Sequence, residues 1–373
     1  MPTKSIQVSK SLQCVDLFAG AGGFSLAAKE VGFSVTAAVE INKHACNTYR
    51  FNVIKSGATA LYEGDILNID PLELLRLHFS SGSECDLLLG GPPCQGFSVH
   101  RINGAGIADP RNKLILRYFE FVKALTPKFF LMENVPGILW PRHKSFLERF
   151  YKEARKSKYD VKAPITIDAR DYGLPQRRKR VFILGTRPDL DMDIVWPPSP
   201  THGDYTECAK DPNLLPWVPS SRVFNMPDID DDENNVHMRH SENLRAVFEA
   251  TPLNGGSRNQ SGRILPCHVT HNGHTDVYGR IDPKAPAPTM TTACINPSKG
   301  RFVHPTKPHG ITVRQAARFQ TFPDWFKFKG GIIAAGEQIG NAVPVDLGKV
   351  LLSAIAASLK QGRTFPAQAN LDD

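Results

Sequence analysis

Short apolar runs alternate with amphipathic stretches through the first half of the chain. Five runs have the length and residue types of buried strands, at residues 13–18, 34–39, 85–89, 129–132 and 181–184. Four stretches repeat apolar residues at helical spacing, at residues 24–31, 43–52, 72–79 and 112–125. Strands that alternate with helices are typical of a parallel sheet covered on both faces. We therefore predict an α/β fold with a doubly wound, mostly parallel sheet.

The pattern changes after Arg187. Residues 188–288 are rich in Pro, Gly, Asn and His and hold few periodic segments. An acidic run within them, residues 228–233, is interpreted as a solvated loop. No internal repeat is visible in the chain.

Helical patterning returns from Ile311, and residues 346–359 form an apolar amphipathic helix that we expect to pack back onto the first domain. This organisation predicts a first domain of residues 1–187, completed by residues 333–373. A second, smaller domain would then span residues 188–332.

Composition and charge narrow the function only moderately. The 373 residues are 41% hydrophobic and 22% charged, and the net charge of +8 is compatible with a nucleic-acid partner, although many enzymes are mildly basic. Seven cysteines show neither metal-ligand spacing nor a disulfide framework, so we expect no metal and a reducing compartment. Residues 1–13 lack the apolar core of a signal peptide, and we expect no membrane span and a cytoplasmic location.

Residues 90–98, Gly-Gly-Pro-Pro-Cys-Gln-Gly-Phe-Ser, place Cys94 directly after an expected strand. Pro93 fixes its own φ and biases Pro92 towards extended geometry, while Gly96 permits close approach of another chain. A strand that delivers a cysteine onto a constrained loop is how an α/β enzyme presents a nucleophile. A lone cysteine is more often a small buried hydrophobe, so this interpretation depends on the stiff surroundings of Cys94.

A glycine-rich turn joins the first expected strand to the first expected helix. It contains Phe18, Ala19, Gly20, Gly22, Gly23 and Phe24. Glycines there let the backbone approach a ligand beyond the carboxyl end of the strand, although many such turns bind nothing. The spacing matches neither the dinucleotide fingerprint nor a phosphate loop.

Two acidic residues follow this turn along the chain. Glu40 closes the second strand, where a carboxylate suits the two hydroxyls of a ribose, but it could equally cap the next helix. Asp65, with Ile66 beside it, offers a second carboxylate or simply a helix start. A nucleoside that needs no phosphate cradle fits this set better than NAD does.

Glu133 ends the apolar strand 129–132 beside a stiff Val-Pro-Gly turn, which makes it a candidate acid or base. A basic run at residues 176–180 precedes the strand 181–184. Such a run is usually a solvated face or a phosphate contact. Alternation along the chain would put Arg178 and Arg180 on one face, where they could orient a carboxylate or a pyrimidine carbonyl.

Together these strings resemble the DNA cytosine-5 methyltransferases. The matching segments are Pro-Cys-Gln at 93–95, Glu-Asn-Val at 133–135, Gln-x-Arg-x-Arg at 176–180, and residues 314–320 and 336–344. The resemblance implies a Rossmann-like, S-adenosylmethionine-dependent methyltransferase domain followed by a target-recognition domain. It also implies a methyl transfer to carbon 5 of cytosine.

The resemblance assigns roles to individual residues. Cys94 would be the covalent nucleophile, Glu133 would donate to the ring, Arg178 would hold the ring carbonyl and Arg180 would orient Glu133. The cofactor would lie on Phe18, Ala19, Gly20, Gly22, Gly23, Phe24, Glu40, Ile41, Asp65, Ile66, Pro93, Asn341, Ala342 and Val343. Ile41 departs from the large aromatic residue that the family often has after Glu40.

The expected substrate is duplex DNA with the target base flipped out of the stack, and residues 95–111 would form a lid over it. The residues expected to bind DNA are Gln95, Ser98, Arg101, Arg258, Asn259, Gln260 and Thr289. We expect a monomer associated with the nucleoid, acting as the protective partner of a separate restriction endonuclease.

Three alternatives stay open from the sequence. The first is a transfer-RNA methyltransferase of the same family, whose Cys-Phe-Thr element is absent here. The second is a catalytically silent DNA-binding regulator on the same fold. The third is a small-molecule methyltransferase, which would leave the Pro-rich insertion without a purpose.

Overall fold

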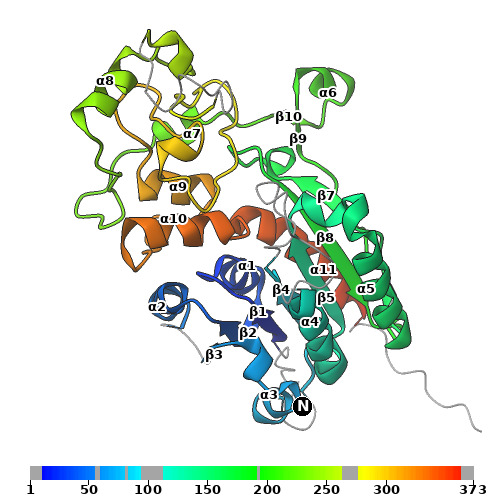
Figure 1. The fold of residues 1–373 in the computed structure, drawn as a ribbon. Helices are drawn as coiled ribbons and strands as arrows, with labels where there is room; N and C mark the ends of the chain where they lie inside the picture. The colour runs from blue at the N-terminus through cyan, green and yellow to red at the C-terminus, as the bar shows by residue number, and fades with distance from the viewer. Residues whose placement is uncertain are drawn as a thin grey trace, which may run out of the picture.

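The computed structural model describes residues 11–54, 59–79, 83–93, 112–190, 194–262 and 276–362 (Figure 1). Its centre is an eight-stranded sheet with the order β3-β2-β1-β4-β5-β8-β6, and β7 pairs with β8. The strands are β1 (Leu12–Leu17), β2 (Phe33–Glu40), β3 (Ala60–Glu63), β4 (Leu87–Gly90), β5 (Phe129–Asn134), β6 (Asp160–Val161), β7 (Ile165–Asp168) and β8 (Lys179–Thr186). The first five strands pair parallel and β8 runs antiparallel to β5, so the predicted fold class is confirmed.

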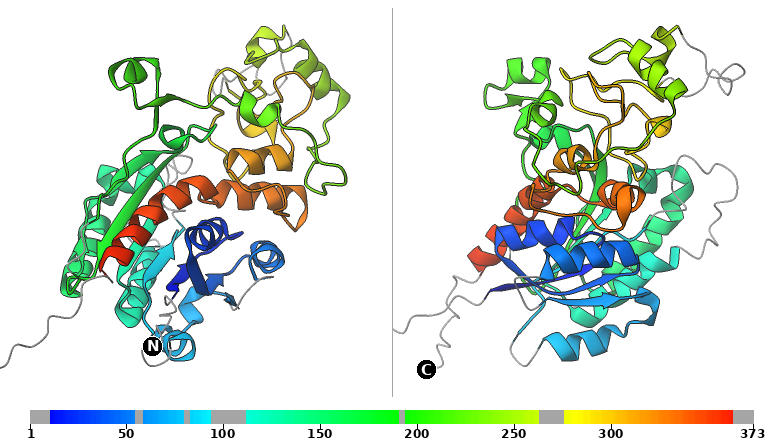
Figure 2. Two further views of the ribbon diagram at one scale, coloured as in Figure 1. Left: turned by 180° about the vertical axis from the view of Figure 1, so that it is seen from behind. Right: turned by 90° about the vertical axis from the view of Figure 1, so that its left-hand side faces the viewer.

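Helices cover both faces of the sheet (Figure 2). They are α1 (Gly23–Val31), α2 (Lys43–Asn52), α3 (Pro71–His78), α4 (Asn112–Leu125), α5 (Lys144–Lys156) and α11 (Val345–Gly362). Successive residues of β5 point to opposite faces: Phe129 and Leu131 join the core under α1 and α11, while Phe130 and Met132 join the core under α4 and α5. Because β5 is buried on both faces, its sequence is a continuous apolar run rather than an alternating one.

The parallel order places the functional strand ends together. β1, β2, β3, β4 and β5 all run the same way, so their carboxyl ends meet at one edge of the sheet. The glycine turn, Glu40, Asp65, Pro93 and Glu133 follow or close these strands. In open α/β sheets ligands bind at this edge, next to the point where the strand order reverses.

The region after β8 has little regular structure and lies over helix α10 (Figure 1). Its elements are β9 (His202–Gly203), α6 (Tyr205–Lys210), β10 (Leu215–Pro216), α7 (Ser221–Phe224), α8 (Glu242–Ala250), η6 (Arg258–Gln260), η8 (Pro297–Lys299) and α9 (Val313–Phe319), and α10 is Gly331–Asn341. Its buried apolar residues, such as Ile281 and Met290, continue the core under α1 and α11. We call residues 188–332 the recognition region, after the target-recognition domain that the sequence predicts there.

All five strands and four helices expected from the pattern are present. The sequence interpretation missed β3 and β7, which are short and lie at or near the edge of the sheet, and α5, whose buried stripe is narrow. The C-terminal helix packs on the first domain as expected: a Cβ on Gly348 would lie 2.7 Å from the Cβ of Ala27 in α1. Only glycine allows the two helix backbones to approach this closely.

The predicted boundary at residues 332 and 333 stays a prediction. Before it, the backbone of Lys327 exchanges two hydrogen bonds with the Asn52 side chain in α2, and the Lys329 N–H donates to Thr48. The end of the recognition region is therefore in contact with the first domain over these residues.

The acidic run 228–233 differs from the expected solvated loop at one position. The Asp232 side chain is fully buried and accepts from Arg314 at 2.5 Å and from Lys327 at 2.9 Å. Burial by itself raises the pKa of a carboxyl group, but these hydrogen bonds outweigh it and hold the pKa of Asp232 below its usual value. Asp232 thus anchors the acidic run to α9, because a buried carboxylate is stable only when it is paired.

The expectation of no membrane-length run also needs correction. Residues Gly331–Gln361 are long and apolar enough by composition to cross a membrane. In the structure this run is the two consecutive helices α10 and α11, and 67% of its most apolar window is buried inside the protein. The run was overlooked because its apolar residues belong to the core.

Candidate active site

The turn between β1 and α1 is shaped by three positive φ angles, at Phe18 (59°), Gly20 (58°) and Gly22 (98°). A Cβ on Gly22 would lie 2.8 Å from Val53 and 2.9 Å from Tyr49, so α2 packs tightly beneath the turn. A Cβ on Gly20 would meet nothing within 4 Å. The turn is therefore closed towards the protein at Gly22 and open at Gly20, as a backbone cradle for a ligand requires.

Glu40 holds this turn directly. Its carboxylate accepts the N–H of Gly20 at 2.7 Å, and also the N–H groups of Ile41 and Asn42 at 2.9 Å and 2.7 Å. The alternative that Glu40 caps the next helix is wrong, since Asn42 caps α2 through His44 and Ala45. A carboxylate has about four lone-pair positions, so Glu40 can still accept from a hydroxyl group.

Asp65 lies beside Glu40 across the β2–β3 pair, where the Gly64 N–H donates to the Glu40 carbonyl at 2.8 Å. One Asp65 oxygen accepts the N–H of Leu67 at 3.0 Å, so Asp65 does start the short helix η2 (Ile66–Asn68). Ile66 is buried, whereas the Ile41 side chain is 63% exposed. An exposed apolar side chain between two carboxylates offers a surface for a planar ring.

The end of α10 closes the other side of the turn. A Cβ on Gly23 would lie 2.7 Å from the carbonyl oxygen of Val343 and 3.5 Å from Ala342. Ala342 and Val343 thus touch the first residue of α1, and Asn341 next to them is exposed. Residues more than 300 positions apart are in this way brought to one turn, as the resemblance implied.

The sequence interpretation missed Asp16, which lies in β1 beneath the turn. Its buried carboxylate accepts from Ser25 at 2.6 Å, and the Ser25 hydroxyl is 2.8 Å from that of Tyr49. Burial raises the pKa of Asp16 to about 7, although the hydrogen bond from Ser25 opposes the shift. The signal was available in the sequence: an acidic residue inside an otherwise apolar strand.

Glu133 is the acidic group at the carboxyl end of β5 and is 8% exposed. The Arg180 Nε lies 2.9 Å from its Oε1 in an ion pair. A Cβ on Gly91 would lie 3.3 Å from its Oε2, so the carboxyl group faces the segment that leads to Cys94. Burial raises the pKa of Glu133, and the nearby Arg180 and Arg178 oppose that shift.

Asn134 connects β5 to the segment that follows β4. The sequence interpretation did not single this residue out. Its side-chain amide donates to the Pro92 carbonyl at 3.3 Å and its carbonyl oxygen accepts the Val135 N–H at 2.8 Å. The segment before Cys94 is thereby fixed to the strand that carries Glu133. Cys94, Gln95, Ser98, Arg101 and the expected lid at 95–111 lie outside the described residues.

Arg178 has different partners from those we expected. It is fully buried and donates to three main-chain carbonyls, of Met290 at 2.9 Å, Gly340 at 2.8 Å and Ala342 at 2.8 Å. Both terminal nitrogens of its guanidinium group are therefore occupied by the protein itself. Three of its five N–H donors are used, and its buried Nε has no hydrogen-bond partner among the described residues, so the expectation that Arg178 holds a pyrimidine carbonyl stays a prediction.

Two buried glutamines extend the contacts of Arg178. Gln176 accepts the Met290 N–H at 2.7 Å and donates to Gln320 at 2.8 Å, and Gln320 donates to the Ala342 carbonyl at 3.0 Å. At the same place a Cβ on Gly340 would lie 2.2 Å from the Thr291 backbone. We call Gln176, Arg178 and Gln320 the junction network, because it joins β8, residues 290–292 and the end of α10.

The expected DNA-binding residues that the structure describes fall in two places. The Thr289 hydroxyl donates to the Arg177 carbonyl at 2.6 Å, next to the junction network. Arg258, Asn259 and Gln260 form η6 in another part of the recognition region, where Gln260 accepts the Ser257 N–H at 2.7 Å and Asn259 is exposed. Gln260 therefore has a local capping role, and both amide residues are exposed.

The site thus combines an acid–arginine pair beside a Pro-Pro-Cys segment with a carboxylate-bound glycine turn, on a doubly wound sheet. Within the described ranges, no group of three His, Cys, Asp or Glu side chains is placed to hold a metal ion. This fold and site define a methyltransferase that acts on a nucleic-acid base.

Comparison with known proteins gives the family. The sequence profile of the C-5 cytosine-specific DNA methylases matches residues 12–357, and the chain belongs to this family. It is a DNA cytosine-5-methyltransferase of the type found in restriction–modification systems. The family uses S-adenosylmethionine as methyl donor.

Relatives match over almost the whole chain. The type II methyltransferase M.XorII of Xanthomonas oryzae pv. oryzae is 30% identical, over 95% of this chain and 87% of its own length. M.NgoPII of Neisseria gonorrhoeae is 32% identical, over 97% of this chain and 100% of its own. Among solved structures, an E. coli prophage protein assigned as a DNA modification methyltransferase is 28% identical with a TM-score of 0.66, covering 94% of this chain and 100% of that one.

Proposed function

We propose that this enzyme methylates carbon 5 of one cytosine within a defined sequence of duplex DNA, through a covalent bond from Cys94 to a flipped-out base. The observation that carries the proposal is the buried Glu133–Arg180 pair, whose carboxyl group faces Gly91, three residues before Cys94. A nucleophile and a proton donor are then in reach of the same ring. We further propose that the methylation protects DNA from a separate restriction endonuclease.

The residues at the sheet edge fit S-adenosylmethionine. Glu40 has a lone-pair position left for a ribose hydroxyl, Ile41 exposes an apolar surface, and the space over Gly20 is open. Phe18, Asp65, Ile66, Asn341, Ala342 and Val343 surround this space or close its edge. When bound, the cofactor supplies an electrophilic methyl group on a sulfonium sulfur.

The protein has to make carbon 5 of cytosine nucleophilic. Attack of the Cys94 thiolate on carbon 6 breaks the double bond between carbons 5 and 6 and moves its electron pair to carbon 5, which takes the methyl group. Transfer of the carbon-5 proton to solvent then restores the double bond and expels Cys94 as a thiolate, and the proton on ring nitrogen 3 returns to Glu133. Both steps leave the thiol unchanged at the end, as nucleophilic catalysis requires.

Glu133 supports the addition by donating a proton to ring nitrogen 3, where negative charge develops. Burial raises the pKa of Glu133, which favours its protonated form over that of an exposed glutamate, and Arg180 fixes its orientation. Arg180 is paired with Glu133, while Arg178 donates to the carbonyls of the junction network and keeps an Nε–H, without a partner among the described residues, for the ring carbonyl. A few kcal/mol are needed to flip the base, and a buried pocket that binds it offsets this cost.

The test uses duplex DNA that contains 5-fluorocytosine, which has no proton to lose from carbon 5 and so traps the adduct. We expect the wild type with S-adenosylmethionine to form a complex that survives denaturing electrophoresis. Cys94→Ala should form none, while the control Cys208→Ala, a partly exposed thiol in α6, should behave as wild type. Bisulfite sequencing of a long natural duplex identifies the motif.

Two outcomes would contradict the proposal. Adduct formation by Cys94→Ala would show that another group is the nucleophile. Wild-type protein that binds S-adenosylmethionine but leaves every cytosine of duplex DNA unmodified would favour the RNA-acting or catalytically silent alternatives. Protection is tested by digesting the modified DNA with the endonuclease from the same genome, which should leave it uncut.

A further inference from the structure

The basic run at residues 177–180 is divided between two environments. Arg178 and Arg180 point inward, whereas Arg177 and Lys179 are exposed, as alternation along an extended chain requires. The backbone of Arg177 is fixed on both sides: its N–H donates to the Ala287 carbonyl at 2.8 Å and its carbonyl accepts from Thr289 at 2.6 Å. Its guanidinium group makes no hydrogen bond or ion pair with any described residue.

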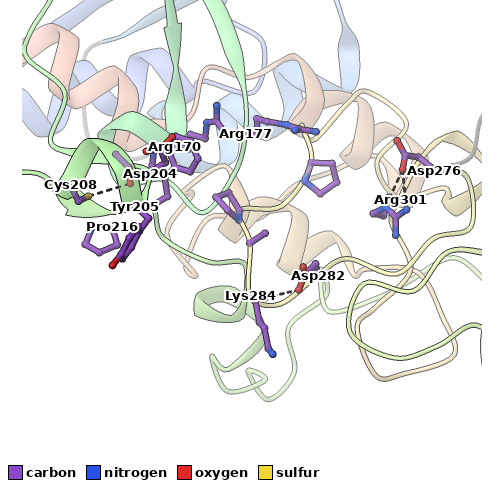
Figure 3. Close-up of a pocket in the computed structure, with 15 residues that line it drawn as sticks. Arg170, Arg177, Asp204, Tyr205, Cys208, Pro216, Asp276, Asp282, Lys284 and Arg301 are labelled. Atoms are coloured by element: carbon purple, nitrogen blue, oxygen red, sulfur yellow. Dashed lines mark hydrogen bonds and ion pairs between the residues drawn. The ribbon is translucent and has the colours of Figure 1, made fainter. Parts of the chain in front are cut away.

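Arg177 lies on a pocket of about 570 Å³ between the first domain and the recognition region (Figure 3). The pocket contains three other cationic side chains. Two are already neutralised: Arg170 Nε is 3.0 Å from Asp168, and Arg301 is 3.1 Å from Asp276. The third is Lys284, whose side chain extends away from Arg177 in Figure 3.

The carboxylates of the pocket restrict where an anion can bind. Asp204 accepts the N–H groups of Thr206 and Glu207, and Asp282 accepts the N–H of Lys284. Neither forms an ion pair with a described residue, although the hydrogen bond from Thr206 and, to a lesser extent, the nearby Arg170 lower the pKa of Asp204, so both carboxylates disfavour an anion beside them. The pocket therefore favours a single anionic group, held at the side of Arg177.

We propose that Arg177 binds a backbone phosphate of the target DNA strand. Arg180, which lies three residues or about 10 Å further along the extended chain, faces Glu133, so Arg177 lies on the same segment as the proposed base-binding pair. The guanidinium fork matches two phosphate oxygens, and an arginine without an internal partner gives up no contact when it binds them. This inference rests on the proposed DNA substrate and adds a contact that positions the strand without reading its sequence.

The test measures DNA affinity as a function of salt concentration for wild type, Arg177→Ala and Arg177→Lys, with S-adenosylhomocysteine present. Each phosphate contact contributes about 0.9 to the slope of log affinity against log salt. We expect Arg177→Ala to reduce the slope by about 1 and the affinity roughly tenfold, with the bisulfite motif unchanged. Arg177→Lys should keep the slope. Arg149→Ala, an exposed arginine of α5 outside the pocket, is the matched control.

Four results would overturn the inference. One is an unchanged slope and affinity in Arg177→Ala, with the wild type binding DNA normally, which leaves the proposed function intact. A second is a changed methylation motif, which would show that Arg177 reads a base. A third is a fall in the melting temperature or cofactor affinity of both variants, which would give Arg177 a structural role. The fourth is a wild type that binds cofactor but no duplex DNA, which would overturn the proposed function as well.

Discussion

The cofactor side and the recognition region hold their chains in place by different means. At the cofactor side, strand ladders satisfy the main chain, and the glycine turn needs one carboxylate, Glu40, to fix it. In the recognition region buried arginines do this work. Arg280 donates to the carbonyls of Phe248, Thr251, His304 and Lys307, at 2.6 to 3.0 Å.

This difference has a physical reason. Loops leave carbonyl groups without a ladder partner, and each buried one must find a donor. A single guanidinium group carries five N–H donors, so one arginine can serve several loop segments at once. Arg178 applies the same solution at the junction of the two regions, with three carbonyls. The main chain of the cofactor side is therefore held by the strand ladders, whereas the conformation of the recognition region depends on a few cationic side chains.

Of the changes predicted here, replacement of Arg280 should have the largest effect, and it should affect the recognition region but not the cofactor side. Arg280→Leu removes the donor of the buried Thr251 and His304 carbonyls, at about 1–3 kcal/mol each. The Phe248 carbonyl keeps the Thr251 N–H, and Lys307 is exposed. We expect fast hydrogen exchange at residues 248–256 and 303–307 and loss of DNA affinity. Exchange in β5 and cofactor affinity should stay as in wild type. The control is Arg222→Leu, an exposed arginine of α7. An equal loss of protection from hydrogen exchange in β5 would mean that the stability of the two regions is not independent.

Glu133→Gln tests the proposed acid catalysis in the first domain. We expect kcat to fall by about 10²–10⁴, the usual range for loss of an acid catalyst, with cofactor and DNA affinity retained.

The pH dependence sharpens this prediction. The carboxyl group must be protonated, so kcat should fall as pH rises through the raised pKa of Glu133, and Glu133→Gln should lose this limb. Arg180→Gln removes a cation that lowers this pKa and should move the limb to higher pH. A limb that stays in place in Arg180→Gln would contradict the assigned pair.

The pH dependence of the free energy of unfolding reports the cost of burying Asp16 beneath the cofactor turn. Its pKa of about 7 lies above its ordinary value of 3.8, so the folded state binds this proton more tightly and its contribution to stability falls as pH rises between these values. Asp16→Asn should therefore raise the free energy of unfolding at pH 8, by up to about 4 kcal/mol, and change it little at pH 4. Urea titrations at the two pH values check this. An equal effect at both would show that Asp16 is not charged in the folded protein at pH 8.

The smallest effect is expected at the open glycine of the turn. Gly20→Ala adds a Cβ that meets nothing and should cost only the strain of a positive φ, about 1–2 kcal/mol. Gly22→Ala has the same strain and also a clash with Val53 and Tyr49, so it should destabilise the protein more. Thermal melts of the two variants compare the two sides of the turn. Equal melting temperatures would contradict the packing beneath Gly22.

The sequence predicted those site residues that lie next to strand ends. Glu40 and Glu133 were found because an acid at the end of an apolar run has a clear pattern, and parallel strands bring such ends together. Residues that support the site from within were missed. Asp16 is one acid inside a strand, and Gln320 lies in a helical segment with no local sign that it reaches Gln176, 144 positions earlier.

The sequence by itself determined the fold class and the family and supplied the candidates for the groups that carry the chemistry, because these depend on local patterns and short motifs. Only the tertiary structure decided which partners Arg178 and Arg180 bind. Alternation places both on one face, but what each meets there comes from distant segments: Glu133 for Arg180, and the carbonyls of Met290, Gly340 and Ala342 for Arg178. Partners of that kind are set by packing, and no local pattern encodes them.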